Sequence, residues 1–376
     1  MGREKRELPI ERLNNAIEGG LEPNSNVLIM VDLVIEKTDF ASALANHHQS
    51  LGDDVVYFLN NKMPKFVTQD LDDDRSCFID GFSTTLNKTS DADYRIEADL
   101  NKEREEHIEE SKKVIKEAVE DKNTFFMDSL DPFVGDWESI VEYKRLLEDD
   151  ERINYFFLPN LGIEEGDKEY EKIKDEFDYF IHLKGLERSG MILKFMDVIN
   201  PSIETKIPFD VTPTGIKMYV PKILVTGPEN SGKTTLVHNM SDTALSTEKS
   251  GTTVALDKGQ VDSNGVKADI FGTPGQKRFD YAMDFLGQGI FGSFIVVDSR
   301  DPDYDRVTEL RENLSGREVP LIVLANFQNK DDAVSPDEIE EEIGLETRGV
   351  DAEHGENLDE SLERLIDKIL EEHSWR

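Results

Sequence analysis

The stretch KILVTGPENSGKTT, residues 222–235, decides the fold of the C-terminal part of this chain. Its apolar run Ile223–Val225 predicts a buried strand, and the residues after the loop follow a helical pattern. Between them the chain fits the spacing G-x-x-x-x-G-K-[ST], in which Gly227 and Gly232 let backbone N–H groups point at phosphate oxygens. Strand, loop and helix in this order therefore predict a phosphate-binding site.

The polar residues of this loop have separate roles in phosphate binding. Lys233 reaches the β- and γ-phosphates, and the hydroxyl of Thr234 can bind Mg²⁺. The new helix adds its positive end to the same anion site. We therefore expect the nucleotide to contact the whole loop, which consists of Gly227, Pro228, Glu229, Asn230, Ser231, Gly232, Lys233, Thr234 and Thr235.

The composition of the chain limits its partners and its location. Its 376 residues include 80 acidic and 43 basic ones, so the formal net charge is −37. Such a chain repels nucleic acid, and we expect no nucleic-acid partner. The single cysteine, Cys77, fits a reducing compartment, and no apolar run approaches the ~20 residues needed to cross a bilayer. We expect a cytoplasmic protein without a transmembrane segment, and peripheral membrane association is left open.

The N-terminal half alternates between strand-like and helix-like stretches, which is typical of a parallel sheet with helices on both faces. Three later runs, Tyr179–Leu186, Met191–Val198 and Ile203–Phe209, have no helices between them and predict antiparallel edge strands. The expected buried strands are Val27–Val31, Val55–Leu59, Cys77–Asp80, Thr124–Asp128 and Ile153–Leu158, and the expected helices are Thr38–Leu51, Glu97–Glu120, Asp136–Glu148 and Lys168–Phe177.

Three segments of this half resemble KaiC-type, RecA-like ATPase domains. They are LPIERLNNAIEGGLEPNSNVLIM at residues 8–30, TFFMDSL at 124–130, and GMILKFMDVINPSIETKIPFDVTPTGIKMYV at 190–220. The resemblance covers about residues 8–220 and implies that Asp128 stands in the magnesium position.

One departure from this family bears on activity. Where the family has its phosphate loop, this chain reads VDLVIEKT, residues 31–38. Lys37 and Thr38 keep the lysine–threonine pair, but the glycines are gone and Glu36 places a carboxylate against phosphate. We therefore expect a domain that has lost ATPase activity. The alternative is an unusual ATP site that uses Lys37 and Asp128.

The second half continues with motifs that suit phosphoryl transfer. In DIFGTPGQKRF, residues 269–279, the N–H of Gly275 can bind the γ-phosphate and Gln276 can orient the attacking water. Further on, the apolar run PLIVLAN ends at Asn326, which would bracket a nucleobase, and Asp351 and Ala352 would close the same site. These segments would add a water-positioning group and a base pocket to the phosphate loop.

These motifs in this order resemble the Ras superfamily, and above all its prokaryotic branch that is similar to Arf proteins and to the signal-recognition-particle receptor β subunit. The matching segments are TTVALDKG, FGTPGQKRF, PLIVLANFQNKDDAVSPDEI and VDAEHGEN, and the resemblance covers about residues 221–376. It implies GTP and GDP as ligands, Mg²⁺, and slow hydrolysis that drives a two-state switch. It also implies that Thr253 binds Mg²⁺ and senses the γ-phosphate. The base contacts that it implies are Asn326, Phe327, Asn329, Asp351 and Ala352, and the ring of Phe327 would stack on the base.

Two departures from this pattern bear on the metal and the base. Gly272 stands where Ras-like proteins usually have an Asp that supports Mg²⁺, and either Asp257 or Asp269 could substitute. Asn329 stands where an Asp usually accepts hydrogen bonds from guanine. The amide of Asn329 would place an N–H donor opposite an N–H donor of guanine. Guanine affinity should therefore fall, and xanthine or inosine nucleotides become candidates. Alternatively, NKDD at residues 329–332 could supply the base motif after a three-residue slip.

The sequence therefore predicts two three-layer α/β domains of the phosphate-loop class. Residues 1–220 would form a degenerate RecA-like domain without its phosphate loop, and residues 221–376 a Ras-like GTPase domain. The catalytic residues would be Gln276, Lys233 and Thr253, and the metal ligands Thr234 and Thr253. The partner would be a protein effector, a GTPase-activating partner or the chain's own N-terminal domain, and a homo-oligomer is left open.

Two other functions fit parts of the sequence. A nucleotide-binding scaffold with little hydrolysis fits the altered base motif and the missing Asp, whereas Gln276 opposes it. A nucleic-acid-coupled ATPase of the RecA kind is disfavoured by the lost glycines and by the charge of −37. The leading hypothesis is therefore a regulatory GTPase.

Overall fold

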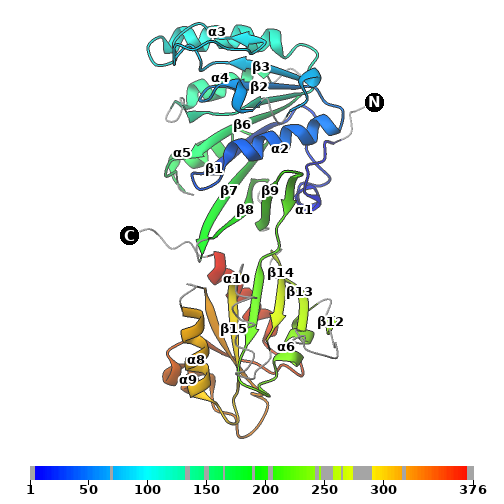
Figure 1. Ribbon diagram of the computed structural model, residues 1–376, viewed down its shortest axis with the longest axis vertical. Helices are drawn as coiled ribbons and strands as arrows, with labels where there is room; N and C mark the ends of the chain where they lie inside the picture. Colours follow the sequence, from blue (N-terminus) through cyan, green and yellow to red (C-terminus); the bar gives the residue numbers. More distant parts are fainter. Residues whose placement is uncertain are drawn as a thin grey trace. The chain divides into compact units, whose positions relative to one another are not determined.

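The structure is a computed structural model that describes residues 5–67, 71–131, 136–147, 152–163, 166–188, 191–201, 206–241, 245–246, 257–263, 266–273, 290–315 and 319–370. The chain divides into two compact units, which are both drawn in Figure 1. The N-terminal unit comprises Met1–Gly185 and Lys194–Met218, and the C-terminal unit comprises Leu186–Leu193 and Tyr219–Arg376. No helix in the described part of the chain is long and apolar enough to cross a membrane.

A large mixed sheet forms the centre of the N-terminal unit. Its strand order is β10-β9-β8-β7-β1-β6-β5-β2-β3-β4. The strands from β7 to β4 in this order pair in parallel, whereas β8, β9 and β10 pair antiparallel. The strands are β1 Asn26–Asp32, β2 Val55–Leu59, β3 Ser76–Asp80, β4 Tyr94–Arg95, β5 Thr124–Met127, β6 Ile153–Asn160, β7 Tyr179–Arg188, β8 Met191–Asn200, β9 Lys206–Thr212 and β10 Gly215–Met218.

Helices cover both faces of this sheet, because its central strands are apolar on both faces. On β1, Ile29 packs in the core on one face, whereas Leu28 and Met30 pack in the core on the other. The alternation of the strand thus sends neighbouring residues to opposite layers. The first face carries α1 Glu11–Ala16 and α2 Lys37–Ser50, and the second carries α3 Arg104–Ala118, α4 Trp137–Leu147 and α5 Lys168–Lys174.

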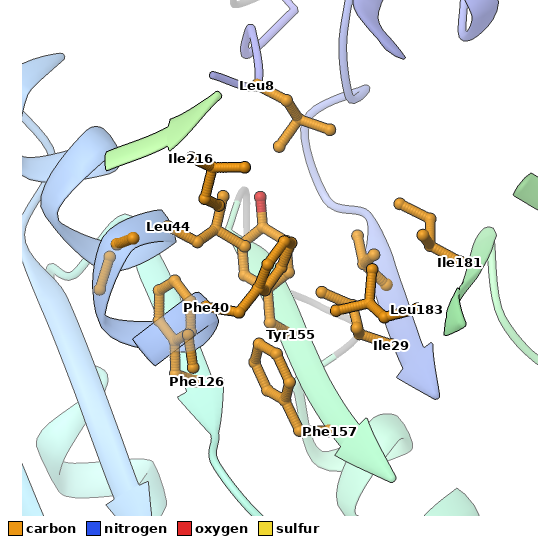
Figure 2. Close-up of a cluster of buried hydrophobic side chains, with 14 of the residues drawn as sticks. Leu8, Ile29, Phe40, Leu44, Phe126, Tyr155, Phe157, Ile181, Leu183 and Ile216 are labelled. Atoms are coloured by element: carbon orange, nitrogen blue, oxygen red, sulfur yellow. The ribbon is translucent and has the colours of Figure 1, made fainter. Parts of the chain in front are cut away.

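The core under α2 fixes the start of that helix. Figure 2 shows Phe40 and Leu44 of α2 among aromatic side chains of the sheet, which include Phe126, Tyr155 and Phe157. Phe126 stacks on Tyr155 with 4.8 Å between the ring centroids. Because α2 is held by its second turn, the residues that begin it stay at the carboxyl end of β1.

Two sequence predictions about this unit are wrong. The run Tyr179–Leu186 is not an antiparallel edge strand, since β7 pairs in parallel with β1. Helix α5 lies between β6 and β7 and provides the crossover that a parallel strand requires. The helix expected from Glu97 begins only at α3, because the carboxylate of Glu110 accepts the N–H groups of Glu97 and Ala98 at 3.0 Å and keeps that segment outside the helix.

The C-terminal unit has its own mixed sheet, with the order β12-β13-β14-β11-β15-β16-β17. Strands β12, β13 and β14 pair antiparallel, and all the other neighbours pair in parallel. Strands β13 and β14 are consecutive and pair antiparallel from Asp257 opposite Gly272 to Ser263 opposite Val266, and residues 264–265 between them lie outside the described residues. The strands are β11 Lys222–Thr226, β12 Leu245–Ser246, β13 Asp257–Ser263, β14 Val266–Gly272, β15 Ile290–Asp298, β16 Leu321–Asn326 and β17 Thr347–Gly349.

Helices again cover both faces of the sheet (Figure 1). Helices α8 (Tyr304–Ser315) and α9 (Pro336–Ile343) bury apolar residues against one face. On the other face lie α6 (Lys233–Met240) and α10 (Leu358–Leu370), and α10 packs so closely that a Cβ on Gly292 of β15 would lie 2.7 Å from Ile369. The carboxyl ends of the parallel strands β14, β11, β15 and β16 meet at one edge of this sheet, where α/β proteins bind ligands.

Candidate functional site

The loop between β11 and α6 has the backbone of a phosphate cradle. Gly227, Asn230 and Gly232 have positive φ angles of 150°, 64° and 94°. A Cβ on Gly227 would lie 2.2 Å from the carbonyl oxygen of Val296, and one on Gly232 would lie 2.2 Å from Nδ2 of Asn326. Only glycine therefore fits at both ends of this loop, in agreement with the spacing of the motif.

Lys233 is the first residue of α6 and is only 8% exposed. Its ammonium donates hydrogen bonds to the carbonyl oxygen of Pro228 and to Ser231 Oγ, so it spans the loop. Burial lowers the pKa of Lys233 to about 8, against the attraction of Glu229 and Asp257. The loop thus surrounds a partly desolvated cation at a helix N-terminus, which suits a phosphate group.

The neighbouring residue, Thr234, faces a carboxylate. Its hydroxyl donates a hydrogen bond to Oδ2 of Asp257 at 2.6 Å, and Asp257 begins β13 opposite Gly272 of β14. Asp269, the other aspartate considered for the missing acidic residue, lies three residues before Gly272 on β14 and forms an ion pair with Lys258 at 2.9 Å. Asp257 is therefore the one of the two that lies at the loop.

Asn326, at the carboxyl end of β16, ties the phosphate loop to a second loop. Its Nδ2 donates to the carbonyl oxygen of Ser231 at 3.0 Å, and its Oδ1 accepts the N–H of Ala352 at 2.9 Å. The side chain is buried. The structure thus brings three of the sequence-predicted binding residues together at one edge of the sheet.

Beside Asn326 lies an aromatic and guanidinium pair that the sequence pattern did not predict. Phe327 has a φ of 69°, and the guanidinium carbon of Arg300 lies 4.1 Å from the centroid of its ring. Two hydrogen bonds of 2.9 and 2.6 Å from Arg300 to Asp298 hold the guanidinium in place. The signal for Arg300 was its position just after a buried strand of the parallel sheet, where neighbouring strand ends meet.

The remaining predicted base contacts differ in their surroundings. Asp351 is 2% exposed and bonds Nδ1 of His354 at 2.6 Å. Asn329 lies exposed in a turn in which the N–H of Lys330 donates to the carbonyl oxygen of Phe327. The structure therefore places Asn326, and not Asn329, against the phosphate loop.

Three predicted residues cannot be placed in this geometry. Thr253, Gly275 and Gln276 lie outside the described residues. Within the loop itself, Glu229 and Thr235 are exposed. Among the residues that the structure does describe, no group of three or more His, Cys, Asp or Glu side chains is placed to hold a metal ion.

The N-terminal unit has a second lysine–threonine pair, at the junction of β1 and α2. Four residues, 33–36, join these two elements, against six, 227–232, between β11 and α6. None of these four described residues has a positive φ, and Leu33 and Val34 are exposed. The backbone of residues 33–36 therefore lacks the curl found in residues 227–232.

Two lysines fill the space beside this shorter loop. The ammonium of Lys62 donates to the hydroxyl of Thr38 and forms an ion pair with Oδ2 of Asp128 at 2.8 Å, and Asp128 is fully buried. Lys37 donates to Ser129 Oγ at 2.8 Å, and burial lowers its pKa. The sequence pattern pointed to Lys37, Thr38 and Asp128 but missed Lys62, which follows a different strand and belongs to no motif.

A match to a known protein family lies in the C-terminal part of the chain. A sequence model of the ADP-ribosylation factor family, Arf, matches residues 215–369. ADP-ribosylation factor-like protein 8b of Arabidopsis thaliana is 32% identical over 126 residues, which are 32% of this chain and 68% of that protein. An uncharacterized protein of Methanocaldococcus jannaschii is 32% identical over 105 residues, which are 28% of this chain and 68% of that protein.

Solved structures of nucleotide-binding proteins are also similar. The Arl6 small GTPase of Trypanosoma brucei, solved with the nucleotide analogue GppNp, covers 40% of this chain and 98% of its own, with 18% identity and a TM-score of 0.34. The G domain of the T. maritima FeoB iron transporter covers 41% of this chain and 100% of its own, with 22% identity and a TM-score of 0.35.

Proposed function

The chain belongs to the ADP-ribosylation factor family through residues 215–369, and from this premise we propose that it is a regulatory GTPase. Its C-terminal unit would bind GTP, hydrolyse it slowly, and thereby change its interaction with an effector, a GTPase-activating partner or the N-terminal unit. The observation that carries the proposal is the phosphate loop, in which Lys233 is buried and Asn326 links Ser231 to Ala352.

The residues beside the loop have the chemistry that Mg²⁺ requires. This ion prefers oxygen donors, and the hydroxyl of Thr234 and the carboxylate of Asp257 are 2.6 Å apart. Mg²⁺ bound there would neutralise charge on the phosphates as the γ-phosphoryl group is transferred. The chain itself would bind the phosphates through Lys233 and the loop backbone, and would orient the attacking water through Gln276.

A single-turnover assay distinguishes this GTPase from a scaffold that binds nucleotide with little hydrolysis. Replacing Gln276 with leucine should slow GTP hydrolysis by at least about tenfold, because a leucine cannot orient water, while GTP affinity stays the same. The rate is followed by phosphate release from the full-length protein with bound GTP and Mg²⁺. Equal rates for wild type and Gln276→Leu would contradict catalysis by this residue and favour the scaffold.

The base preference follows from the residue at position 329. An amide there should weaken guanine binding, so Asn329→Asp should raise GTP affinity by about tenfold through one charge-assisted hydrogen bond. Calorimetric titration with GTP, XTP, ITP and ATP measures the change, and XTP affinity should fall in the same variant. The matched control is Asp332→Asn, which should leave GTP affinity unchanged. The opposite pattern, in which only Asp332→Asn affects GTP, would support the three-residue slip.

The N-terminal unit would be a RecA-like domain that no longer hydrolyses ATP. Its parallel core places Asp128 after β5 and the Lys37-Thr38 pair after β1, which supports the relationship. The short loop of residues 33–36 and the ammonium of Lys62 between Thr38 and Asp128 support the loss of activity. We infer that this unit reads the nucleotide state of the C-terminal unit or recruits the partner that does.

A further inference from the structure

The side chain of Asp257 reaches the phosphate loop from β13, outside the segment that forms the loop itself. Oδ2 of Asp257 accepts a hydrogen bond of 2.6 Å from the hydroxyl of Thr234, the second residue of α6. Asp257 is also close enough to Lys233 for its charge to act on that ammonium. One carboxylate therefore faces both the hydroxyl and the cation with which such loops bind a magnesium nucleotide.

Phosphate-loop proteins hold Mg²⁺ with the loop threonine or serine and with an acidic residue from a neighbouring strand. At the carboxyl end of β14, next to β11, the chain has Gly272, which supplies no side chain. Gly272 is the register partner of Asp257 on β13. A Cβ built on Gly272 would lie 3.2 Å from Cβ of Asp257 and 3.4 Å from its Oδ2. A side chain at position 272 would thus begin in the space that Asp257 fills.

The other nearby aspartate does not meet this requirement. Asp269 pairs with Lys222 at the start of β11, whereas the loop follows the end of that strand. Its carboxylate is engaged by Lys258 at 2.9 Å and by Gln260 at 3.4 Å. The spacing along the strand, about 3.3 Å per residue, keeps Asp269 about 10 Å before Gly272.

We propose that Asp257 is the carboxylate that holds Mg²⁺ beside Thr234, in place of the acidic side chain that Gly272 lacks. The carboxylate comes from Asp257 on β13, which faces position 272 on the adjacent strand β14, and it would bind the ion at the same place. This inference rests on the proposed GTPase function, because it assumes that the loop binds a magnesium nucleotide.

The test is the Mg²⁺ dependence of GDP binding to the full-length protein. GDP affinity is measured by calorimetry in EDTA and at a series of Mg²⁺ concentrations, for wild type and Asp257→Asn. The variant should need about 10- to 100-fold more Mg²⁺ to reach half of the metal-induced gain in GDP affinity. In EDTA its GDP affinity should not be weaker than that of wild type, which also shows that the variant is folded.

Two further variants complete the experiment. Asp269→Asn is the matched control and should keep the Mg²⁺ dependence of wild type. The double variant Asp257→Gly with Gly272→Asp should recover part of the Mg²⁺ dependence that Asp257→Asn loses, because the new carboxylate on β14 occupies the same space. If Asp257→Asn kept the Mg²⁺ dependence of wild type, or if Asp269→Asn lost it, this inference would be overturned. The proposed GTPase function would not be affected. Failure of the wild type to bind GDP at any Mg²⁺ concentration would overturn the proposed function, and this inference with it.

Discussion

Replacing Lys233 with alanine is expected to weaken the binding of GTP and GDP by at least about 150-fold, since two charge-assisted hydrogen bonds to phosphate are worth about 3 kcal/mol. Lys233 is 8% exposed, and its ammonium already spans the loop between the carbonyl oxygen of Pro228 and Ser231 Oγ. Alanine removes the buried cation and leaves the loop without its positive centre. Calorimetric titration of the full-length protein with GTP, GDP and ATP, each with Mg²⁺, measures the loss.

The pH dependence of binding separates this role from general damage to the fold. Burial lowers the pKa of Lys233 to about 8. Below that pH the lysine is protonated with or without nucleotide, so its effect on affinity is constant. Above that pH, Lys233 loses its proton in the free protein but keeps it in the complex, where the phosphate stabilises the ammonium. Wild-type affinity should therefore fall by up to about tenfold per pH unit. Lys233→Ala should show no such fall.

Lys267→Ala is the matched control, because Lys267 lies five residues before Gly272 on β14, away from the loop. It should bind GTP as the wild type does and keep the fall in affinity above pH 8. Tight GTP binding by Lys233→Ala would contradict the assignment of this lysine and of the site around it.

The second large effect concerns the stability of the N-terminal unit. Replacing Lys62 with alanine should lower the free energy of unfolding of this unit by about 3–5 kcal/mol, because the change removes the cation that contacts a buried carboxylate. That carboxylate belongs to Asp128, which is fully buried and ion-paired with Lys62 at 2.8 Å. The hydroxyl of Thr38 loses its partner in the same change.

Urea unfolding followed by tryptophan fluorescence measures this effect. The chain has two tryptophans, Trp137 in α4 of the N-terminal unit and Trp375 near the C-terminus. In a Trp375→Phe background the signal therefore reports on the N-terminal unit of the full-length protein. The exposed Lys88 provides a control, since Lys88→Ala should change stability by less than about 0.5 kcal/mol.

A double variant tests whether the loss comes from the unpaired charge. Adding Asp128→Ala to Lys62→Ala removes the carboxylate as well, and should recover a large part of the lost stability. If Lys62→Ala lowered the free energy of unfolding by less than about 1 kcal/mol, the pair would contribute no more than a surface ion pair does. The assignment of Lys62 as the cation that stabilises the buried carboxylate would then be wrong.

The sequence allowed those parts of the site to be predicted that lie in one continuous segment. The strand, the loop and the start of α6 are set by local backbone chemistry, which the glycines and Lys233 reveal. Asp257 and Asp269 both looked suitable, and only the register of β13 on β14, which pairs Asp257 with Gly272, separates them. Such a register depends on how both strands pack, so the sequence of either strand alone does not specify it.

The same limit explains what was missed elsewhere. Lys62 acts through Thr38 and Asp128, which follow other strands, and nothing in its neighbouring residues indicates this. Arg300 lies just after a buried strand, but its contact with Phe327 of another loop depends on how the strands meet. The direction of β7 was mispredicted although the helix before it was expected, because Tyr179–Leu186 was grouped with the two antiparallel strands that follow it. Its pairing with β1 is a long-range contact that the local sequence does not specify. The three residues predicted to sense the γ-phosphate or to orient water, Thr253, Gly275 and Gln276, remain predictions from sequence alone.

The ammonium of Lys62 also determines how the N-terminal unit responds to its surroundings. A magnesium ion leaves its site when chelators or dilution lower its concentration, but a cation tethered to the backbone beside Thr38 and Asp128 is always present at a high effective concentration. If the N-terminal unit binds no nucleotide, as proposed, its charge balance would not change with the supply of nucleotide and free metal. The cation proposed for the C-terminal unit is an exchangeable Mg²⁺. The charge at that site would therefore change with nucleotide and metal, while the charge beside Asp128 stays constant.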